Sequence, residues 1–285
     1  MRRNQALACM LAAAALTTGA HSQEARLADT GLYRAGSTTE LADGVLPFSP
    51  QYPLWSDGAA KRRWLHLPPG TFIDASRPDA WEFPAGTKLW KEFSHGRRVE
   101  TRLVERLGDG TWRFAAYVWN EAGTDATLAP EAGIPALPVA GAPRGRYAVP
   151  AEPDCRACHE GAAVPVLGVS ALQLSPDRDA LAPHAEPRKV GDVDLSDLVQ
   201  RGLLRNLPRA VLESPPRIPA ATPAERAALG YLHGNCGHCH NDNGSPVPVD
   251  LVLWQKAREN AKVLRSLLGA PSRYRAPGAP VASAV

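Results

Sequence analysis

Hydrophobic and polar positions alternate along two neighbouring stretches in the first half of the chain, residues 99–104 and 111–119. In the second stretch, Trp112 and Phe114 fall on one face of an extended strand. A period of two residues is typical of β-strands with one buried face. Gly108-Asp109-Gly110 separates the two stretches, which predicts a hairpin turn.

Aromatic residues are concentrated in the same part of the chain. All five phenylalanines lie between Phe48 and Phe114, and six of the seven tryptophans lie between Trp55 and Trp119. Short strands separated by turn signals are typical of sandwich and jelly-roll domains. Residues 23–128 are therefore predicted to form an all-β, sandwich-like domain.

The second half of the chain has helical patterns instead. Asp194 and Thr222 are each followed three residues later by an acidic residue, which is a signal for the start of a helix. Residues 254–268 are amphipathic and are predicted to form a further helix that ends before Gly269.

These patterns predict a multidomain protein of α and β structure, with a mainly α region after the all-β domain. The predicted parts are a signal peptide at 1–22, a β-rich domain at 23–128, a Pro/Gly-rich linker at 129–153, and two helical segments at 154–221 and 222–285.

The N-terminus has the features of a signal peptide. Arg2 and Arg3 precede the unbroken apolar run 6–16, and Ala20-His21-Ser22 supplies small residues for cleavage before Gln23. The apolar run is too short for a transmembrane helix, so no membrane span is expected after cleavage. The expected location is the periplasm.

Composition gives little reason to expect a polyanionic partner. Removal of residues 1–22 takes away Arg2 and Arg3 and no acid, so the formal net charge falls from +3 to +1. Binding to nucleic acid or to an anionic membrane surface is therefore not expected.

Two pentapeptides supply the clearest chemical signal, Cys155-Arg156-Ala157-Cys158-His159 and Cys236-Gly237-His238-Cys239-His240. Each has the form C-x-x-C-H, the attachment site of a c-type haem. The thiols add to the haem vinyl groups, and the histidine supplies one axial ligand to the iron. We expect two covalently attached haems (heme c). Their thioethers would form at Cys155, Cys158, Cys236 and Cys239, and their iron ligands would be His159 and His240.

Three other chemistries also use paired C-x-x-C cysteines: a zinc site, a redox-active dithiol and structural disulfides. The gap between Cys158 and Cys236 is much longer than in a compact zinc ribbon. Zinc also gives no reason for a histidine directly after both second cysteines. Haem is therefore the favoured interpretation.

The two motifs share a further feature. His159 is followed six residues later by Pro165, and His240 is followed six residues later by Pro246. A proline carbonyl in such a loop can accept the ring N–H of the proximal histidine, which orients the imidazole and raises its basicity. Proline is common in turns, so chance could also explain this repetition.

The chain resembles a largely uncharacterised family of exported bacterial proteins that couple a β-rich N-terminal region to a cytochrome c-like C-terminal part. The resemblance rests on residues 53–59, 67–70, 100–102, 117–120, 154–159, 166–168 and 235–241. It implies haem binding and electron transfer with a redox protein partner, and it implies no particular substrate. Family members usually continue into a methionine-bearing loop, whereas residues 276–280 of this chain read Ala-Pro-Gly-Ala-Pro. Segment 154–221 is thus the expected first haem-binding segment, and 222–285 is the expected second, cytochrome c-like segment, truncated or altered at its end.

The sixth ligands of the irons are left open by the sequence. The only methionines, Met1 and Met10, lie in the signal peptide, so the mature chain cannot form a His/Met pair. Beyond the signal peptide, the other histidines are His66, His95, His184, His233 and His238. His184 is the favoured distal candidate, whereas His238 cannot easily reach the far side of the haem bound by its own motif.

Polar residues of the β-rich part form no recognised catalytic pattern. They include Asp57, Glu92, His95 and Glu100. The basic stretches 61–63 and 97–98 are interpreted as solvated faces, or as a docking patch for an acidic redox partner.

The leading hypothesis is a periplasmic di-haem c-type cytochrome that transfers single electrons. The alternative is a haem-dependent oxidoreductase, peroxidase-like or an oxidase, with substrate or partner bound by the β-rich domain. A third hypothesis is a sensor or binding module in which haem is mainly structural.

Overall fold

The computed structural model describes residues 23–181, 186, 188–243, 249–257, 259 and 261–268. The predicted signal peptide, His184 and Pro246 lie outside the described residues. The largest element is an antiparallel sheet of six strands, with the other strands paired in two small ribbons. In this part of the chain, no helix is long and apolar enough to cross a membrane.

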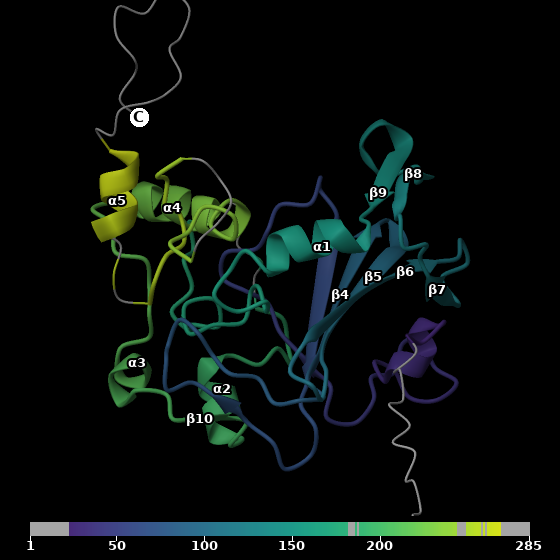
Figure 1. Ribbon diagram of the computed structural model, residues 1–285, viewed down its shortest axis with the longest axis horizontal. Helices are drawn as coiled ribbons and strands as arrows, with labels where there is room; N and C mark the ends of the chain where they lie inside the picture. The colour runs from purple at the N-terminus through teal and green to yellow at the C-terminus, as the bar shows by residue number, and fades with distance from the viewer. Residues whose placement is uncertain are drawn as a thin grey trace, which may run out of the picture.

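The main sheet has the strand order β1-β2-β4-β5-β6-β7 (Figure 1). Its strands are β1 (Leu46–Pro47), β2 (Ala60–His66), β4 (Lys88–His95), β5 (Arg97–Arg106), β6 (Trp112–Trp119) and β7 (Ala126–Leu128). The predicted hairpin at 108–110 is confirmed, because it joins β5 to β6.

The alternation of side chains along the strands gives the sheet two apolar faces. Trp64, Trp90 and Tyr117 pack on one face against the N-terminal segment, which contains the short 3-10 helix η1 (Leu27–Thr30). The other face presents a different set of buried side chains, among them Leu65, Leu89 and Phe114. It is covered by chain from beyond residue 160, including Val166, Leu174, Leu195 and Val211.

Two small ribbons complete the β structure. β3 (Ile73–Asp74) pairs in parallel with β10 (Leu204–Arg205), so residues far apart in sequence lie side by side. β8 (Ile134–Pro138) and β9 (Arg146–Val149) form an antiparallel hairpin around the 3-10 turn η2 (Pro143–Gly145). This hairpin lies within the segment 129–153.

The part of the chain that the structure describes has five helices, and all are short. They are α1 (Glu152–His159), α2 (Leu195–Gln200), α3 (Arg209–Glu213), α4 (Pro223–Asn235) and α5 (Ala261–Leu267). The predicted starts of α2 and α4 are confirmed. The Asp194 carboxylate caps α2 by accepting from the Asp197 amide, and the Thr222 hydroxyl caps α4 by accepting from the Glu225 amide. The predicted helix over 254–268 is wrong in extent, because only its last part is helical.

The predicted fold, an all-β sandwich followed by a mainly α cytochrome c-like region, is wrong. In the part of the chain that the structure describes, a single main sheet takes the place of a sandwich, and no mainly α region follows it. Irregular chain over 160–181 and short helices cover the sheet instead of a second sheet. Because these helices are too short to bury much apolar area among themselves, the sheet supplies the main apolar surface on which α1 and α2 pack.

Candidate functional site

The first C-x-x-C-H motif forms the last five residues of helix α1, which lies beside the main sheet (Figure 1) and contacts strand β6. Residues three and four apart lie on the same face of a helix, so Cys155, Cys158 and His159 share one face. The helix begins at Ala151, whose N–H donates to the Asp154 carboxylate at 3.0 Å. Helix geometry therefore presents two thiols and one imidazole together.

The imidazole of His159 is fixed by its surroundings. Its Nδ1 lies 2.6 Å from the Pro165 carbonyl oxygen, and its ring packs 5.1 Å from that of Phe114. A carbonyl can only accept, so Nδ1 holds the proton and the lone pair is on Nε2. Burial lowers the pKa of His159 to about 4, which keeps the ring neutral. The predicted contact with Pro165 is present, and it leaves Nε2 free for a metal.

The second motif lies in a turn that follows a helix. α4 ends at Asn235, and the Cys236 carbonyl then accepts from the amides of Cys239 at 3.1 Å and His240 at 2.8 Å. The Nδ1 of His240 is buried and has no hydrogen-bond partner in the part of the chain that the structure describes. The contact predicted with Pro246 lies outside that part.

The two motifs touch each other. The Asn241 side-chain amide donates to the Gly161 carbonyl at 2.8 Å, and also contacts the carbonyls of Gly237 and His238 at 3.2 and 3.0 Å. A Cβ atom on Gly161 would lie only 2.9 Å from the His238 carbonyl oxygen. A glycine is needed at residue 161 because the chain after α1 approaches the second turn so closely.

A cavity of about 170 Å³ opens beside the first motif. Its lining includes Arg63, Leu89, Lys91, Arg102 and Val104 from the sheet, Cys155, Cys158 and His159 from the first motif, and His233 and His238 from the second segment. The cysteines of the second motif and His240 do not line it. The site is therefore shared between the β-rich part and the segments that follow it.

Three cations form a row across the sheet wall of this cavity. Arg63 on β2 pairs in register with Lys91 on β4, and Lys91 pairs with Arg102 on β5. Like charges directly opposite each other in neighbouring strands are destabilising. Glu186 pairs with Arg63, and Glu100 pairs with Arg102 at 2.8 Å.

Lys91, in the middle of the row, has no carboxylate partner among the described residues. Its ammonium lies 4.8 Å from the Phe93 ring centre. Burial, with the charges of Arg63 and Arg102, lowers the pKa of Lys91 well below its usual range. An anionic group entering the cavity would therefore be stabilised here.

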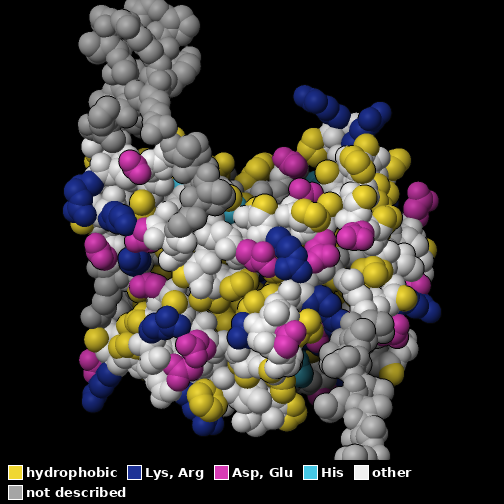
Figure 2. All heavy atoms as spheres, in the orientation of Figure 1, with side chains coloured by type: hydrophobic (Ala, Val, Ile, Leu, Met, Phe, Trp, Pro, Cys, Tyr) yellow, Lys and Arg dark blue, Asp and Glu magenta, His cyan; other side chains and the backbone are white. Residues whose placement is uncertain are grey.

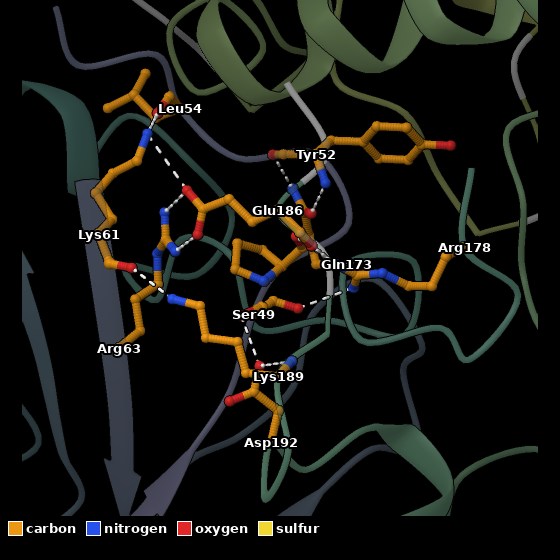
Figure 3. A network of polar contacts seen from close by, with 11 residues as sticks. Ser49, Tyr52, Leu54, Lys61, Arg63, Gln173, Arg178, Glu186, Lys189 and Asp192 are labelled. Carbon is orange, nitrogen blue, oxygen red and sulfur yellow. Dashed lines mark hydrogen bonds and ion pairs between the residues drawn. The ribbon is translucent and has the colours of Figure 1, made fainter. Parts of the chain in front are cut away.

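A buried polar network holds the segment before β2 against Gln173, Arg178, Glu186 and Asp192 (Figure 3). The Ser49 hydroxyl donates to Asp192 at 2.7 Å, and the Arg178 guanidinium donates to the Ser49 carbonyl at 2.8 Å. The Gln173 side chain bonds both the N–H and the carbonyl of Tyr52. Arg63 and Lys61 both contact Glu186. This network fixes one end of the cation row.

The four thiols are free and half-buried. Burial raises the pKa of Cys155, Cys158 and Cys236, so these thiols are protonated at neutral pH. Within the described ranges, no three His, Cys, Asp or Glu side chains converge as ligands of one metal ion. The cysteines are thus neither paired as disulfides nor gathered into one zinc site.

The other predicted polar residues lie apart from the cavity. His66 and His95 do not line it, and the buried Nε2 of His95 has no partner in the described structure. Glu92 faces Tyr33 on the opposite side of the sheet. Asp57 also lies outside the cavity lining. Glu100 is linked to the cavity only through its ion pair with Arg102, which lines it.

The interpretation of stretch 61–63 as a solvated face is wrong for Arg63, which is buried. In stretch 97–98, Arg98 packs 3.7 Å from the Trp119 ring centre. Sequence analysis missed Lys91 and Arg102. The available signal was their position on the same strand face as Leu89 and Val104.

Acidic and basic side chains are interspersed on the face of the molecule shown in Figure 2. That face has no large area of a single charge. Comparison of the chain with protein-family models, with curated proteins and with solved structures gives no match.

Proposed function

We propose that this protein is a periplasmic c-type cytochrome that carries covalently attached haem c and transfers single electrons to and from a redox protein. The observation that supports this proposal best is the first motif. Cys155, Cys158 and His159 share one helix face at a cavity, and His159 has its Nε2 free. Those are the donor atoms that a c-type haem requires.

The residues present fit such a group at the first motif. Cys155 and Cys158 would form its thioethers, and His159 Nε2 would ligate its iron. Leu89, Val104 and Val166 would cover its apolar faces, while Arg63, Lys91 and Arg102 would neutralise its carboxylates. The bound iron supplies one-electron oxidation and reduction. The Pro165 carbonyl orients the imidazole and raises its basicity, which tunes that chemistry.

At the second motif, Cys236, Cys239 and His240 would hold a second haem. The buried Nδ1 of His240 matches the first motif in having a ring nitrogen directed away from solvent. Cys239 lies close enough to Cys158 to raise its pKa further. Two haems at these thiols would be near neighbours, which suits electron transfer between them.

Covalent haem content is the direct test. The full chain would be expressed with its signal segment in a bacterium equipped for periplasmic haem attachment. Intact mass and a pyridine haemochrome assay are expected to give two haems per chain. Zinc or disulfides in place of haem at all four cysteines would overturn the proposal.

The alternative function, a haem-dependent oxidoreductase, is favoured by one observation, the cavity beside His159. Such an enzyme needs an iron position that an outside molecule can reach. Addition of carbon monoxide to the reduced protein distinguishes the two functions. We expect no binding to an electron-transfer protein with both irons six-coordinate, whereas rapid binding would favour the enzyme.

A further inference from the structure

If the proposed function holds, the iron at the first motif needs a sixth ligand from within the chain or is left open. Beyond residue 22 the sequence has no methionine. Among the described residues, three nitrogen-bearing side chains suitable as iron ligands line the cavity besides His159: His233, His238 and Lys91.

His233 is committed to a structural role. Its Nδ1 accepts the Gln255 backbone N–H at 3.0 Å, and a backbone amide can only donate. The proton of the neutral ring is therefore on Nε2, which leaves no free lone pair for iron. The ring is also held edge-on between Tyr52 and Trp254, at 6.3 and 4.9 Å.

Lys91 is the second competitor. Burial and the charges of Arg63 and Arg102 lower its pKa, whereas the Phe93 ring face, 4.8 Å away, favours its charged form. An ammonium has no lone pair, so Lys91 would have to lose its proton before it could bind a metal. Its place in the cation row suits an anion better.

His238 has none of these constraints. Its side chain is 9% exposed, and neither ring nitrogen has a hydrogen-bond partner in the part of the chain that the structure describes. The charged and titratable groups that act on it are Lys91 and His240, and it acts in turn on His159.

The backbone around His238 is held in place. Asn241 ties the His238 carbonyl to Gly161, the second residue after His159. Gly161 permits this approach because it has no Cβ atom. The turn of the second motif therefore presents its central histidine to the cavity of the first.

We propose that His238 is the sixth ligand of the iron bound at the first motif. The second motif would then bind its own haem through Cys236, Cys239 and His240, and would also ligate the neighbouring iron. This gives a reason for a histidine between the two cysteines, where it cannot reach round its own haem. It also makes the first haem six-coordinate only when the two motifs are in contact.

The test uses the haem-loaded full chain and the variants His238→Ala, Lys91→Leu and His66→Ala. Covalent haem count by mass is recorded with the optical, magnetic circular dichroism and electron paramagnetic resonance spectra. His238→Ala is expected to keep the wild-type haem count while one haem becomes high-spin and binds carbon monoxide. Added imidazole is expected to restore the low-spin spectrum. His66→Ala, which is outside the cavity, is expected to match the wild type.

Two further variants secure the assignment. In a Cys236→Ser/Cys239→Ser background, only the first haem remains, so the change caused by His238→Ala must be seen there too. His238→Met, which retains a ligand, is expected to stay low-spin with the near-infrared charge-transfer band of a His/Met pair and a raised potential.

Two outcomes would overturn the inference while leaving the proposed function standing. One is an unchanged low-spin spectrum in His238→Ala, above all if Lys91→Leu becomes high-spin instead. The other is a wild-type first haem that is already high-spin. Absence of haem from Cys155 and Cys158 in the wild type would instead overturn the proposed function itself.

Discussion

The two C-x-x-C-H motifs have the same sequence pattern and very different surroundings. The first lies on a helix packed against the sheet, and its imidazole N–H is paired with Pro165. The second lies in a turn after α4, and the Nδ1 of His240 has no partner among the described residues. The same pattern therefore stands in two different settings, and a haem attached at each motif as proposed would be supported differently by the chain around it.

Removal of the cysteine pairs tests this difference most strongly. Cys155→Ser/Cys158→Ser and Cys236→Ser/Cys239→Ser are each expected to lose one haem by intact mass. The first pair should cost more stability, because its haem would fill a cavity walled by the sheet. We expect its melting temperature to fall by about 5–10 °C more than that of the second pair, a few kcal/mol for a chain of this size. Equal losses in thermal unfolding would contradict the contrast between the motifs.

Glu186→Gln tests the ion pairs that support the cavity beside the first motif, and it leaves the second motif unchanged. It leaves the buried Arg63 and its neighbour Lys61 without their carboxylate, which is expected to cost about 3 kcal/mol. Chemical denaturation measures this loss. The matched control Glu213→Gln breaks an exposed pair with Arg209 and should change stability by less than about 0.5 kcal/mol.

The same carboxylate predicts a pH dependence. Burial alone would raise the pKa of Glu186, but the hydrogen bond and charge of Arg63, with Lys61, lower it below 4.5. A depressed pKa contributes stability that is fully present above the unfolded value and is lost as pH falls through the folded value. The difference in free energy of unfolding between wild type and Glu186→Gln should therefore stay constant from neutral pH down to about 5, and shrink in more acid solution. A gap that widens on acidification would refute this assignment.

Gly161→Ala tests the contact between the two motifs. Its Cβ would meet the carbonyl oxygens of His238 and Ala157 at 2.9 and 3.3 Å, so the chain must shift. We expect a loss of about 1–3 kcal/mol, together with partial conversion of the first haem to high spin. Gly108→Ala, with no atom within 4 Å of its Cβ, is the control and should change neither property. An unperturbed first haem in Gly161→Ala would show that the two motifs act independently.

Lys91→Met should have the smallest effect on stability. Loss of one charge from a row of three cations is expected to leave the haem-free chain unchanged or stabilise it by up to about 1 kcal/mol. In the loaded protein, loss of a positive charge beside the first haem should lower its reduction potential, as measured by redox titration. Lys88→Met, on the opposite face of the same strand, serves as the control. A potential that falls equally in both variants would argue against a charge effect within the cavity.

Local signals in the sequence were sufficient for several features of this fold. Caps at Asp194 and Thr222, the turn at 108–110 and the contact of His159 with Pro165 each depend on residues within about six positions of each other. Such interactions are determined by short-range geometry, so a pattern can predict them.

Features that depend on distant residues were not predictable. Alternation along a strand shows that one face of the strand is buried, but not whether a second sheet or irregular chain covers it. The prediction of a sandwich was wrong for this reason. The cations Lys91 and Arg102 occupy positions that the alternation assigns to an apolar face. Their role depends on the first motif packing beside this face of the sheet, and nothing in the sequence near β4 or β5 predicts that contact.

The parallel pairing of β3 with β10 has a consequence for the order in which the chain folds around the site. This pair forms only when Ile73 and Leu204 come together, and the first motif lies on the long stretch of chain between them. Closing so long a loop is slow, because its entropy cost precedes the contacts that repay it. During that interval the thiols of the first motif are on an open chain, before the sheet has its cover. In the folded chain Cys155 and Cys158 are half-buried at the cavity, so a group that attaches to them is expected to reach them more easily before the loop closes.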